Sequence, residues 1–195
     1  MTNPQFTPDL FRARLDAQDL SLQATPKPGL RRAAVLVPFL NFEGQWRLLF
    51  TRRTETVQNH KGQVSFPGGA LEQIDSSLEA AALREAHEEI GLKPADVVIW
   101  GRLPEMQTIT YYSITPVIGA IPWPYPLRIS ADEVSRAFTI PLTWLADRSN
   151  WEEKEWAPRG GDPRRVIFFK PYDGEVLWGI SAQITIDLLA VLGLS

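Results

Sequence analysis

The sequence predicts a single domain of the mixed α/β class, on three observations. The chain has 195 residues, which is the usual length of one domain. Apolar runs that suit strands recur along it, at 33–40, 46–53 and 113–121. Between the second and the third run, the apolar residues of 76–90 follow the period of a helix. Hydrophobic residues make up 44% of the chain and charged residues 22%, and this balance is typical of a folded globular protein.

The N-terminal segment predicts a short helix at residues 7–15. A threonine suited to the cap and a proline suited to the first helical position precede an amphipathic pattern. Residues 23–30, which contain two prolines and a glycine, then interrupt any regular element. We therefore interpret residues 1–30 as an N-terminal helical extension and residues 31–195 as the main domain.

Five segments before residue 122 predict strands. Residues 33–40 and 46–53 are apolar runs separated by a short turn, which favours a hairpin. Residues 63–66 predict a further short strand, and residues 96–103 and 113–121 predict two more. Strands of this kind around a helix favour an α/β arrangement over an all-β one.

Residues 76–90 predict an amphipathic helix. Ser76 or Ser77 suits its N-cap, and Gly91 suits its C-cap. Its apolar stripe consists of Ala82, Leu83, Ala86 and Ile90. At 100° per residue, three glutamates cluster about a third of a turn from that stripe, namely Glu85, Glu88 and Glu89. The three acids are therefore expected to border the buried face and to stay accessible.

The rest of the chain alternates loops and short elements. Residues 122–128 form a proline-rich loop whose aromatic rings either flank a ligand such as a base or pack for structural reasons. Residues 131–138 are expected to begin a short helix or a turn. Residues 165–170 and 175–179 are strand candidates, and residues 181–193 predict a final helix.

Composition excludes several classes of function. The net charge of −3 argues against nonspecific nucleic-acid binding, because such proteins normally carry a basic face. The absence of cysteine excludes disulfides and thiolate zinc sites, so any metal is held by oxygen ligands or by His60 and His87. No apolar stretch reaches the ~18 residues of a membrane span, and the N-terminal segment lacks the pattern of a signal peptide. We expect a cytoplasmic protein without a membrane partner.

The acidic cluster raises a physical question. Like charges three or four residues apart weaken a helix by about a few tenths of a kcal/mol per pair. A bound divalent cation such as Mg²⁺ explains the clustering of these carboxylates, because this ion is coordinated by carboxylate oxygens together with substrate phosphates. The alternative is a solvated acidic face, softened by Arg84 and Lys93. Gly68 and Gly69, shortly before the helix, let the backbone approach a ligand or a metal closely.

The glycine pair followed by "REAHEEIGL" resembles the Nudix box, which marks hydrolases of nucleoside diphosphates linked to another moiety. Seven positions of its second half match: Arg84, Glu85, Ala86, Glu88, Glu89, Gly91 and Leu92. The resemblance implies the Nudix fold, a mixed β-sheet sandwiched between helices, and the use of Mg²⁺ or Mn²⁺. The spacer before Arg84 is one residue longer than usual and lacks the customary glutamate, for which Glu72 and Asp75 are the candidate replacements.

Residues 48–69 are similar to the signature that precedes the box in coenzyme A pyrophosphatases. The matching positions are Thr51, Arg53, Gly62 and the run 66–69, whereas Gln58 stands where that signature usually has an arginine. The similarity implies hydrolysis of coenzyme A to 3′,5′-ADP and 4′-phosphopantetheine. Two alternatives stay open: a Nudix hydrolase of ADP-ribose, NADH or a nucleotide sugar, and a catalytically silent nucleotide sensor. We expect a monomer or a homodimer.

The resemblance also implies roles for individual residues. Glu85, Glu88 and Glu89 are the expected metal ligands, and Arg84 is expected to orient them.

Substrate contacts are expected from the basic residues before the box and from the backbone of the glycine pair. These residues are Arg52, Arg53, His60, Lys61, Gly68 and Gly69. For the general base we favour Glu133, which lies in a region where several Nudix enzymes supply an acid from outside the box. Glu85 is the other candidate.

Overall fold

The structure is a computed structural model that describes residues 8–16, 29–55, 62–108, 111–157 and 163–194. Its helices are α1 (Pro8–Asp16), α2 (Leu78–Ile90), α3 (Leu142–Leu145) and α4 (Gly179–Leu192), with short 3₁₀ turns η2 (Pro94–Asp96) and η3 (Arg148–Asn150). Its strands are β1 (Arg31–Phe42), β2 (Gln45–Arg53), β3 (Val64–Ser65), β4 (Gly68–Ala70), β5 (Val98–Arg102), β6 (Met106–Gln107), β7 (Tyr112–Ala120), β8 (Val134–Pro141), β9 (Trp151–Trp156) and β10 (Arg164–Phe169).

Eight of the described strands form one mixed sheet around β1. This strand pairs in parallel with β7 and antiparallel with β2 and β4. The far side of β2 pairs with β3 and β8, and the far side of β7 pairs with β5 and β6. The predicted hairpin at 33–40 and 46–53 is therefore confirmed, as are the strands predicted at 63–66, 96–103 and 113–121.

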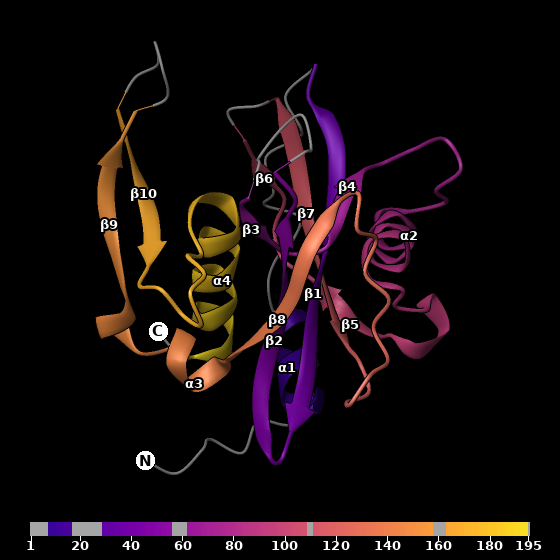
Figure 1. The fold of residues 1–195 in the computed structure, drawn as a ribbon, viewed down its shortest axis with the longest axis horizontal. Coiled ribbons are helices and arrows are strands. Elements are labelled where there is room, and N and C mark those ends of the chain that lie inside the picture. Colours follow the sequence, from indigo (N-terminus) through magenta and orange to yellow (C-terminus); the bar gives the residue numbers. More distant parts are fainter. Residues whose placement is uncertain (1–7, 17–28, 56–61, 109–110, 158–162, 195) are drawn as a thin grey trace.

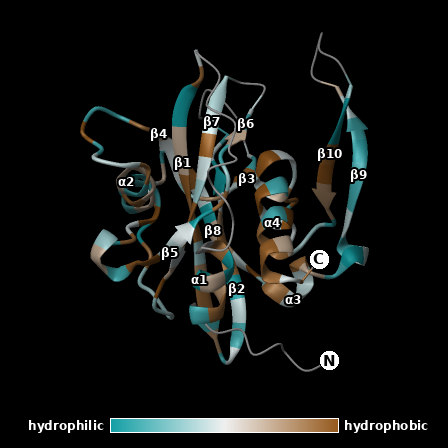
Figure 2. Cartoon of the chain, turned by 180° about the vertical axis from the view of Figure 1, so that it is seen from behind, coloured by the Kyte–Doolittle hydropathy of each residue, from teal (hydrophilic) through white to brown (hydrophobic). Residues whose placement is uncertain are grey.

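Helices cover both faces of this sheet. In Figure 1, α2 lies on one side of the sheet and α4 on the other. The residues that pack under α2 form one apolar core, and a second, larger core on the opposite face combines residues of α1, α4 and the sheet. Figure 2 colours α4 mainly brown, as expected for a helix that is buried in this second core. The sandwich predicted for the sheet is confirmed.

The predicted N-terminal helix is present as α1 and packs into the larger core. The Phe11 ring is buried, with its centroid 5.4 Å from that of Phe39 and 5.3 Å from that of Trp100. Leu15 packs over Gly101, where an added Cβ would lie 3.0 Å from its Cδ1 atom. The predicted cap, Thr7, lies outside the described residues.

In the C-terminal third, one predicted strand is absent and one observed strand has no counterpart in the sequence prediction. Residues 175–179 form no strand, because Tyr172 and Glu175 close a tight turn and Trp178 makes only a single bridge to Phe168. The strand β9 was not foreseen, since its sequence WEEKEW has no apolar alternation. It pairs only with β10, in a two-stranded ribbon beside the main sheet in Figure 1, so most of its side chains face solvent.

The segment 131–138 contains the expected turn but no helix. Residues 131–133 turn, and β8 then pairs with β2 along its whole length. Val134 is buried, and Phe138 and Ile140 are buried in the larger core, which outweighs the helical pattern of "ADEVSRAF". The helix predicted at 181–193 is confirmed as α4. Among the described residues, no helix is long and apolar enough to cross a membrane.

Candidate active site

Helix α2 is fixed at both ends as its sequence predicts. The Ser77 hydroxyl accepts a hydrogen bond from the backbone N–H of Ala80 at 3.1 Å, and Gly91 ends the helix in the left-handed conformation with φ 69°. An apolar face of this helix packs on the sheet, with Leu78, Ala81, Ala82, Ala86 and Ile90 buried. This packing fixes the rotation of α2 about its own axis, and so the direction in which its three glutamates point relative to β4.

The three glutamates differ strongly in exposure. The Glu88 side chain is 53% exposed and that of Glu85 15%, whereas Glu89 is 2% exposed. The expectation that all three stay accessible is therefore wrong for Glu89. Its carboxylate turns toward β2, where Arg53 faces it, and toward the backbone N–H of Gly68.

The glycine pair makes room for this arrangement. A Cβ on Gly69 would lie 2.4 Å from Oε1 of Glu85, and a Cβ on Gly68 would lie 2.4 Å from the carbonyl oxygen of Ala34. Both distances are far shorter than a normal contact between carbon and oxygen. Gly68 therefore allows β4 to approach β1, and Gly69 allows the Glu85 carboxylate to rest on the backbone of β4.

Arg84 holds two of the glutamates in place. Its Nη1 donates to Oε1 of Glu85 at 2.9 Å and to Oε2 of Glu88 at 3.0 Å. Its Nε and Nη2 donate to the two carboxylate oxygens of Asp75 at 3.0 and 3.1 Å, and Nη2 also donates to the Ala70 carbonyl. With every guanidinium nitrogen engaged inside the protein, Arg84 is placed to orient the acids.

Asp75, and not Glu72, occupies the place of the missing glutamate in the spacer. Hydrogen bonding to Arg84 lowers the pKa of Asp75, and the same hydrogen bonding to Asp75 raises the pKa of Arg84. Glu72 contributes only through its backbone, whose N–H donates to Oδ2 of Asp75 at 2.9 Å. The extra residue in the spacer is thus absorbed in a turn that delivers Asp75 to Arg84.

Glu89 is a buried carboxylate whose charge is incompletely compensated. The Nη1 atom of Arg53 lies 3.7 Å from Oε1 of Glu89. Oε2 of Glu89 and Nε of Arg53 are buried and have no hydrogen-bond partner among the described residues. Burial raises the pKa of Glu89 to about 8, and the charges of Glu85 and Glu133 act in the same direction, while Arg53 opposes them. Burial likewise raises the pKa of Glu85, against the influence of Arg84.

Glu133 joins this group from the turn that precedes β8. Its side chain is exposed, and its charge raises the pKa of both Glu85 and Glu89. Its backbone carbonyl accepts a hydrogen bond from the Thr54 N–H at 2.9 Å, which ties the start of β8 to the end of β2. No helix begins here, so the Glu133 carboxylate does not complement a helix dipole.

These carboxylates fit a hard divalent cation. In the described part of the chain, no three His, Asp or Glu side chains stand ready to enclose a metal, because Arg84 ties Glu85 and Glu88 while Glu89 faces Arg53. The Oε2 atom of Glu89 is nevertheless buried without a partner among the described residues, and a bound cation would compensate its charge. The candidate ligand atoms are all carboxylate oxygens, which a hard divalent cation prefers. His87 is exposed and takes no part in these contacts.

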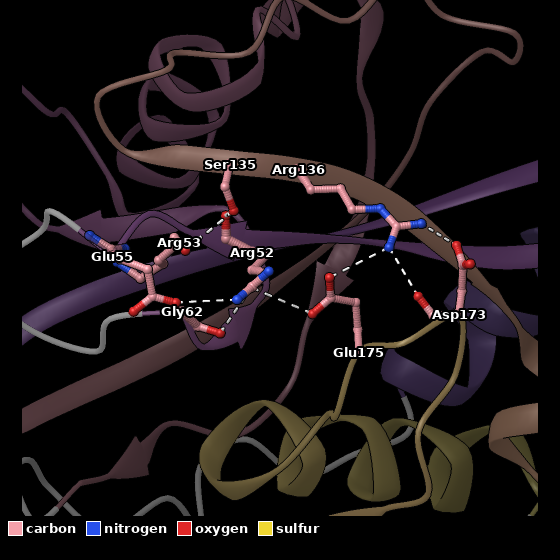
Figure 3. A network of polar contacts seen from close by, with 8 residues as sticks. All are labelled: Arg52, Arg53, Glu55, Gly62, Ser135, Arg136, Asp173 and Glu175. Carbon is pink, nitrogen blue, oxygen red and sulfur yellow. Dashed lines mark hydrogen bonds and ion pairs between the residues drawn. The ribbon is translucent and has the colours of Figure 1, made fainter.

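The predicted basic residues separate in space. Arg53 faces α2 and the acidic group, whereas Arg52, the preceding residue on β2, faces the opposite side of the sheet. There its Nε lies 3.6 Å from Oε2 of Glu175, and its Nη2 donates to Oε1 of Glu55 at 3.2 Å (Figure 3). Lys61, like His60 and Gln58, lies outside the described residues.

The aromatic loop 122–128 makes structural contacts. The Tyr125 hydroxyl donates to Oδ2 of Asp96 at 2.7 Å and accepts from the backbone N–H of Lys93 at 3.1 Å. Trp123 packs against the core under α2. These contacts agree with the packing alternative for this loop.

Comparisons with known proteins agree on one family. The sequence pattern of the family described as "NUDIX domain" matches residues 30–160. A Salmonella dublin protein named "Uncharacterized Nudix hydrolase NudL" is 38% identical over 194 residues, covering 99% of this chain and 98% of the relative. Its namesake from Shigella boydii serotype 4 is 40% identical over 163 residues, covering 84% and 83% of the two chains.

A solved structure shares the fold. The crystal structure of a MutT/nudix family protein from Enterococcus faecalis superposes with a TM-score of 0.52 at 16% identity, over 97% of this chain and 76% of that chain. At this identity the likeness concerns the fold alone.

Proposed function

The chain belongs to the NUDIX domain family, and from this premise we propose that it hydrolyses the pyrophosphate bond of coenzyme A with the help of Mg²⁺ or Mn²⁺. The products of this reaction are 3′,5′-ADP and 4′-phosphopantetheine. At the coarser level the chain is a Nudix hydrolase of a nucleoside diphosphate derivative. The choice of coenzyme A rests on residues 48–69, which are similar to the signature of coenzyme A pyrophosphatases.

One observation supports the hydrolytic reading most directly. Glu89 is a buried carboxylate with an unpaired oxygen, and it lies among two further carboxylates, Glu85 and Glu133, and one guanidinium, Arg53. Such a group is costly in an apolar protein core unless a cation joins it. Hydrolysis of a diphosphate needs this combination, because negative charge on the phosphate oxygens must be neutralised and a water must be activated.

The proposed ligands of the metal are Glu85, Glu88 and Glu89. When bound, the metal neutralises phosphate oxygens and lowers the pKa of a coordinated water. Arg84 keeps Glu85 and Glu88 in position through the two hydrogen bonds at 2.9 and 3.0 Å.

Arg53 is proposed to bind a phosphate oxygen of the substrate. Its Nε has no hydrogen-bond partner in the described structure, and a guanidinium is well suited to phosphate.

Glu133 is the proposed general base, with Glu85 as the other candidate. No described residue forms an ion pair with Glu133, and its side chain is exposed, so it is free to accept a proton from the attacking water. Glu85 accepts a hydrogen bond from Arg84, and this bond favours its ionised form as a ligand. We therefore assign Glu85 to the metal and Glu133 to the proton.

Gln58 supports a second candidate function. An arginine usually occupies this position in the signature of coenzyme A pyrophosphatases, so one basic contact to the substrate is missing here. A Nudix hydrolase of ADP-ribose, NADH or a nucleotide sugar would not need that contact. A silent sensor is the less favoured reading, because the three box glutamates are all present.

A substrate panel tests the proposal. The purified chain is incubated with coenzyme A, dephospho-coenzyme A, ADP-ribose and NADH, each in the presence of Mg²⁺ or Mn²⁺. The products are separated by chromatography and identified by mass spectrometry. We expect the highest kcat/KM for coenzyme A and the two products named above. A Glu89→Gln preparation, purified in parallel, controls for contaminating hydrolases. A higher kcat/KM for ADP-ribose or NADH would establish the second candidate instead.

A further inference from the structure

A β-bulge separates the two arginines of β2. Arg52 lies opposite Arg136 on β8, but the next pair is Arg53 with Val134, so Ser135 has no partner across the ladder. A bulge increases the local twist and changes the direction of side chains, and it often occurs beside active sites. Here it lies directly beside Arg53, which faces the acidic group.

The Ser135 side chain closes the bulge. Its hydroxyl lies 3.1 Å from the carbonyl oxygen of Arg52 and 3.4 Å from that of Arg53, and it donates to these acceptors (Figure 3). The Arg52 carbonyl belongs to the peptide bond that leads into Arg53, and the Arg53 carbonyl belongs to the peptide bond that follows it. A single side chain on β8 thereby fixes the backbone orientation of Arg53 on β2.

Neighbouring contacts anchor both sides of this peptide. Figure 3 shows Arg52 and Arg136 turned toward Glu175, with Nε of Arg52 3.6 Å from Oε2 and Nη1 of Arg136 3.5 Å from Oε1. The Glu175 side chain is 11% exposed, so this contact is largely shielded from solvent. After the bulge, the Thr54 hydroxyl donates to the carbonyl of Asp132 at 3.0 Å.

We propose that Ser135 is a positioning residue for the hydrolytic reaction, acting through Arg53. Arg52 is held on one face of the sheet by Glu175, and because consecutive residues of a strand point to opposite faces, Arg53 is directed to the other. Ser135 sets the peptide between them, and so the distance of the Arg53 guanidinium from Glu89. The inference rests on the proposed function, in which Arg53 acts on the substrate and Glu89 binds the metal.

A double-mutant cycle tests this assignment. Ser135→Ala removes the hydroxyl and leaves the size of an exposed side chain almost unchanged, and Arg53→Lys removes the fixed fork of the guanidinium. In the parent chain, Ser135→Ala is expected to lower kcat about fivefold, the value of one ordinary hydrogen bond. In the Arg53→Lys background the same change is expected to lower kcat less than about twofold, because the group that Ser135 positions is gone.

Further variants separate positioning from folding. Ser135→Thr keeps the hydroxyl and should restore kcat to the parent value. Ser135→Cys is a second test that retains a weak donor and should give an intermediate kcat. Thr139→Val is the matched control on the same strand pair: it removes the acceptor of Nε of Arg47 at 2.7 Å, away from the bulge, and should leave kcat unchanged. Melting temperatures of all variants report any general loss of folding.

Mn²⁺ binding without substrate provides a readout that does not depend on the reaction. The dissociation constant, measured from free Mn²⁺ by electron paramagnetic resonance, should change at least about twofold on Ser135→Ala in the parent and not in Arg53→Lys. Equal factors in both backgrounds, for kcat and for Mn²⁺, would overturn the proposal, and so would an unchanged kcat in Ser135→Ala. If the panel identifies another nucleotide as substrate, the proposed function fails and the cycle is run on that nucleotide.

Discussion

Gly69→Ala is expected to damage catalysis while leaving the fold intact. The substitution adds one methyl group, which would lie 2.4 Å from Oε1 and 2.5 Å from Cδ of Glu85. An ordinary contact begins at 3.4 Å, so the carboxylate must retreat by about 1 Å. This shift breaks the geometry of the 2.9 Å hydrogen bond from Arg84 and moves a proposed metal ligand. A misplacement of about 1 Å can cost about a hundredfold in rate.

Stability should change little, because Gly69 does not have a positive φ and replacing such a glycine removes conformational freedom from the unfolded chain. The assay is kcat at saturating substrate over a Mg²⁺ titration, with the melting temperature measured on the same samples. Two controls separate the causes. Gly68→Ala would clash with the Ala34 backbone and should lower the melting temperature. At Gly44 an added Cβ meets no atom within 4 Å, but the φ of 79° strains an alanine there, at a position far from the glutamates. A Gly69→Ala variant that retains more than about half of the parent kcat would refute the close approach of Glu85 to β4 as a catalytic requirement.

Three further changes probe the same structure. Glu89→Gln should lower kcat by orders of magnitude at saturating Mg²⁺ with a native circular dichroism spectrum, because it removes a charge from the proposed metal site; near-normal kcat would leave no catalytic role for this carboxylate. Glu133→Gln should lower kcat at neutral pH and leave the affinity for Mn²⁺ unchanged, and its kcat should recover partly at high pH, where hydroxide replaces the water that the base assists. If Glu85→Gln shows this pH dependence instead, the general base is Glu85. Asp187→Asn should raise the melting temperature at pH 7. Burial raises the pKa of the Asp187 carboxyl, so the folded state favours the protonated form, and the stability that this form contributes is lost as pH rises through the folded pKa. The gain in melting temperature should vanish below about pH 4, where the carboxyl is protonated in both states, and a gain that persists there would exclude burial of the charge as its cause.

Local signals in the sequence predicted α2 well. Its cap at Ser77, one of two candidates, its end at Gly91 and three of its buried residues follow from the sequence of the helix itself, whereas Leu83 of the predicted stripe is only half-buried. The burial of Glu89 could not be predicted in the same way, because it depends on Arg53 and Gly68, which reach it from two other elements. Spacing alone also left Glu72 and Asp75 equal, and the turn that delivers Asp75 to Arg84 decides between them.

Strand pairing explains the remaining differences. The pattern of 131–138 favoured a turn or a helix, and only the ladder with β2 reveals a strand with a bulge at Ser135. No residue type marks such a bulge, so Ser135 carried no signal in the sequence. In the same way, adjacent arginines on β2 read as one basic cluster, although the alternation of a strand sends Arg52 and Arg53 to opposite faces.

The charge balance of the site bears on how a diphosphate enters it. On the proposed assignment, the carboxylates of Asp75, Glu85, Glu88, Glu89 and Glu133 gather around two guanidinium groups, those of Arg53 and Arg84. Arg84 is already committed to Asp75, Glu85 and Glu88, so of these two guanidinium groups in the described part of the chain, that of Arg53 is the one available to an incoming phosphate. A diphosphate therefore meets an excess of negative charge, and in a partly buried site this repulsion is weakly screened by salt. On the proposed assignment, we therefore expect a divalent cation to be required for substrate binding as well as for the chemical step, because the three glutamates on one helix repel a diphosphate until the cation binds them.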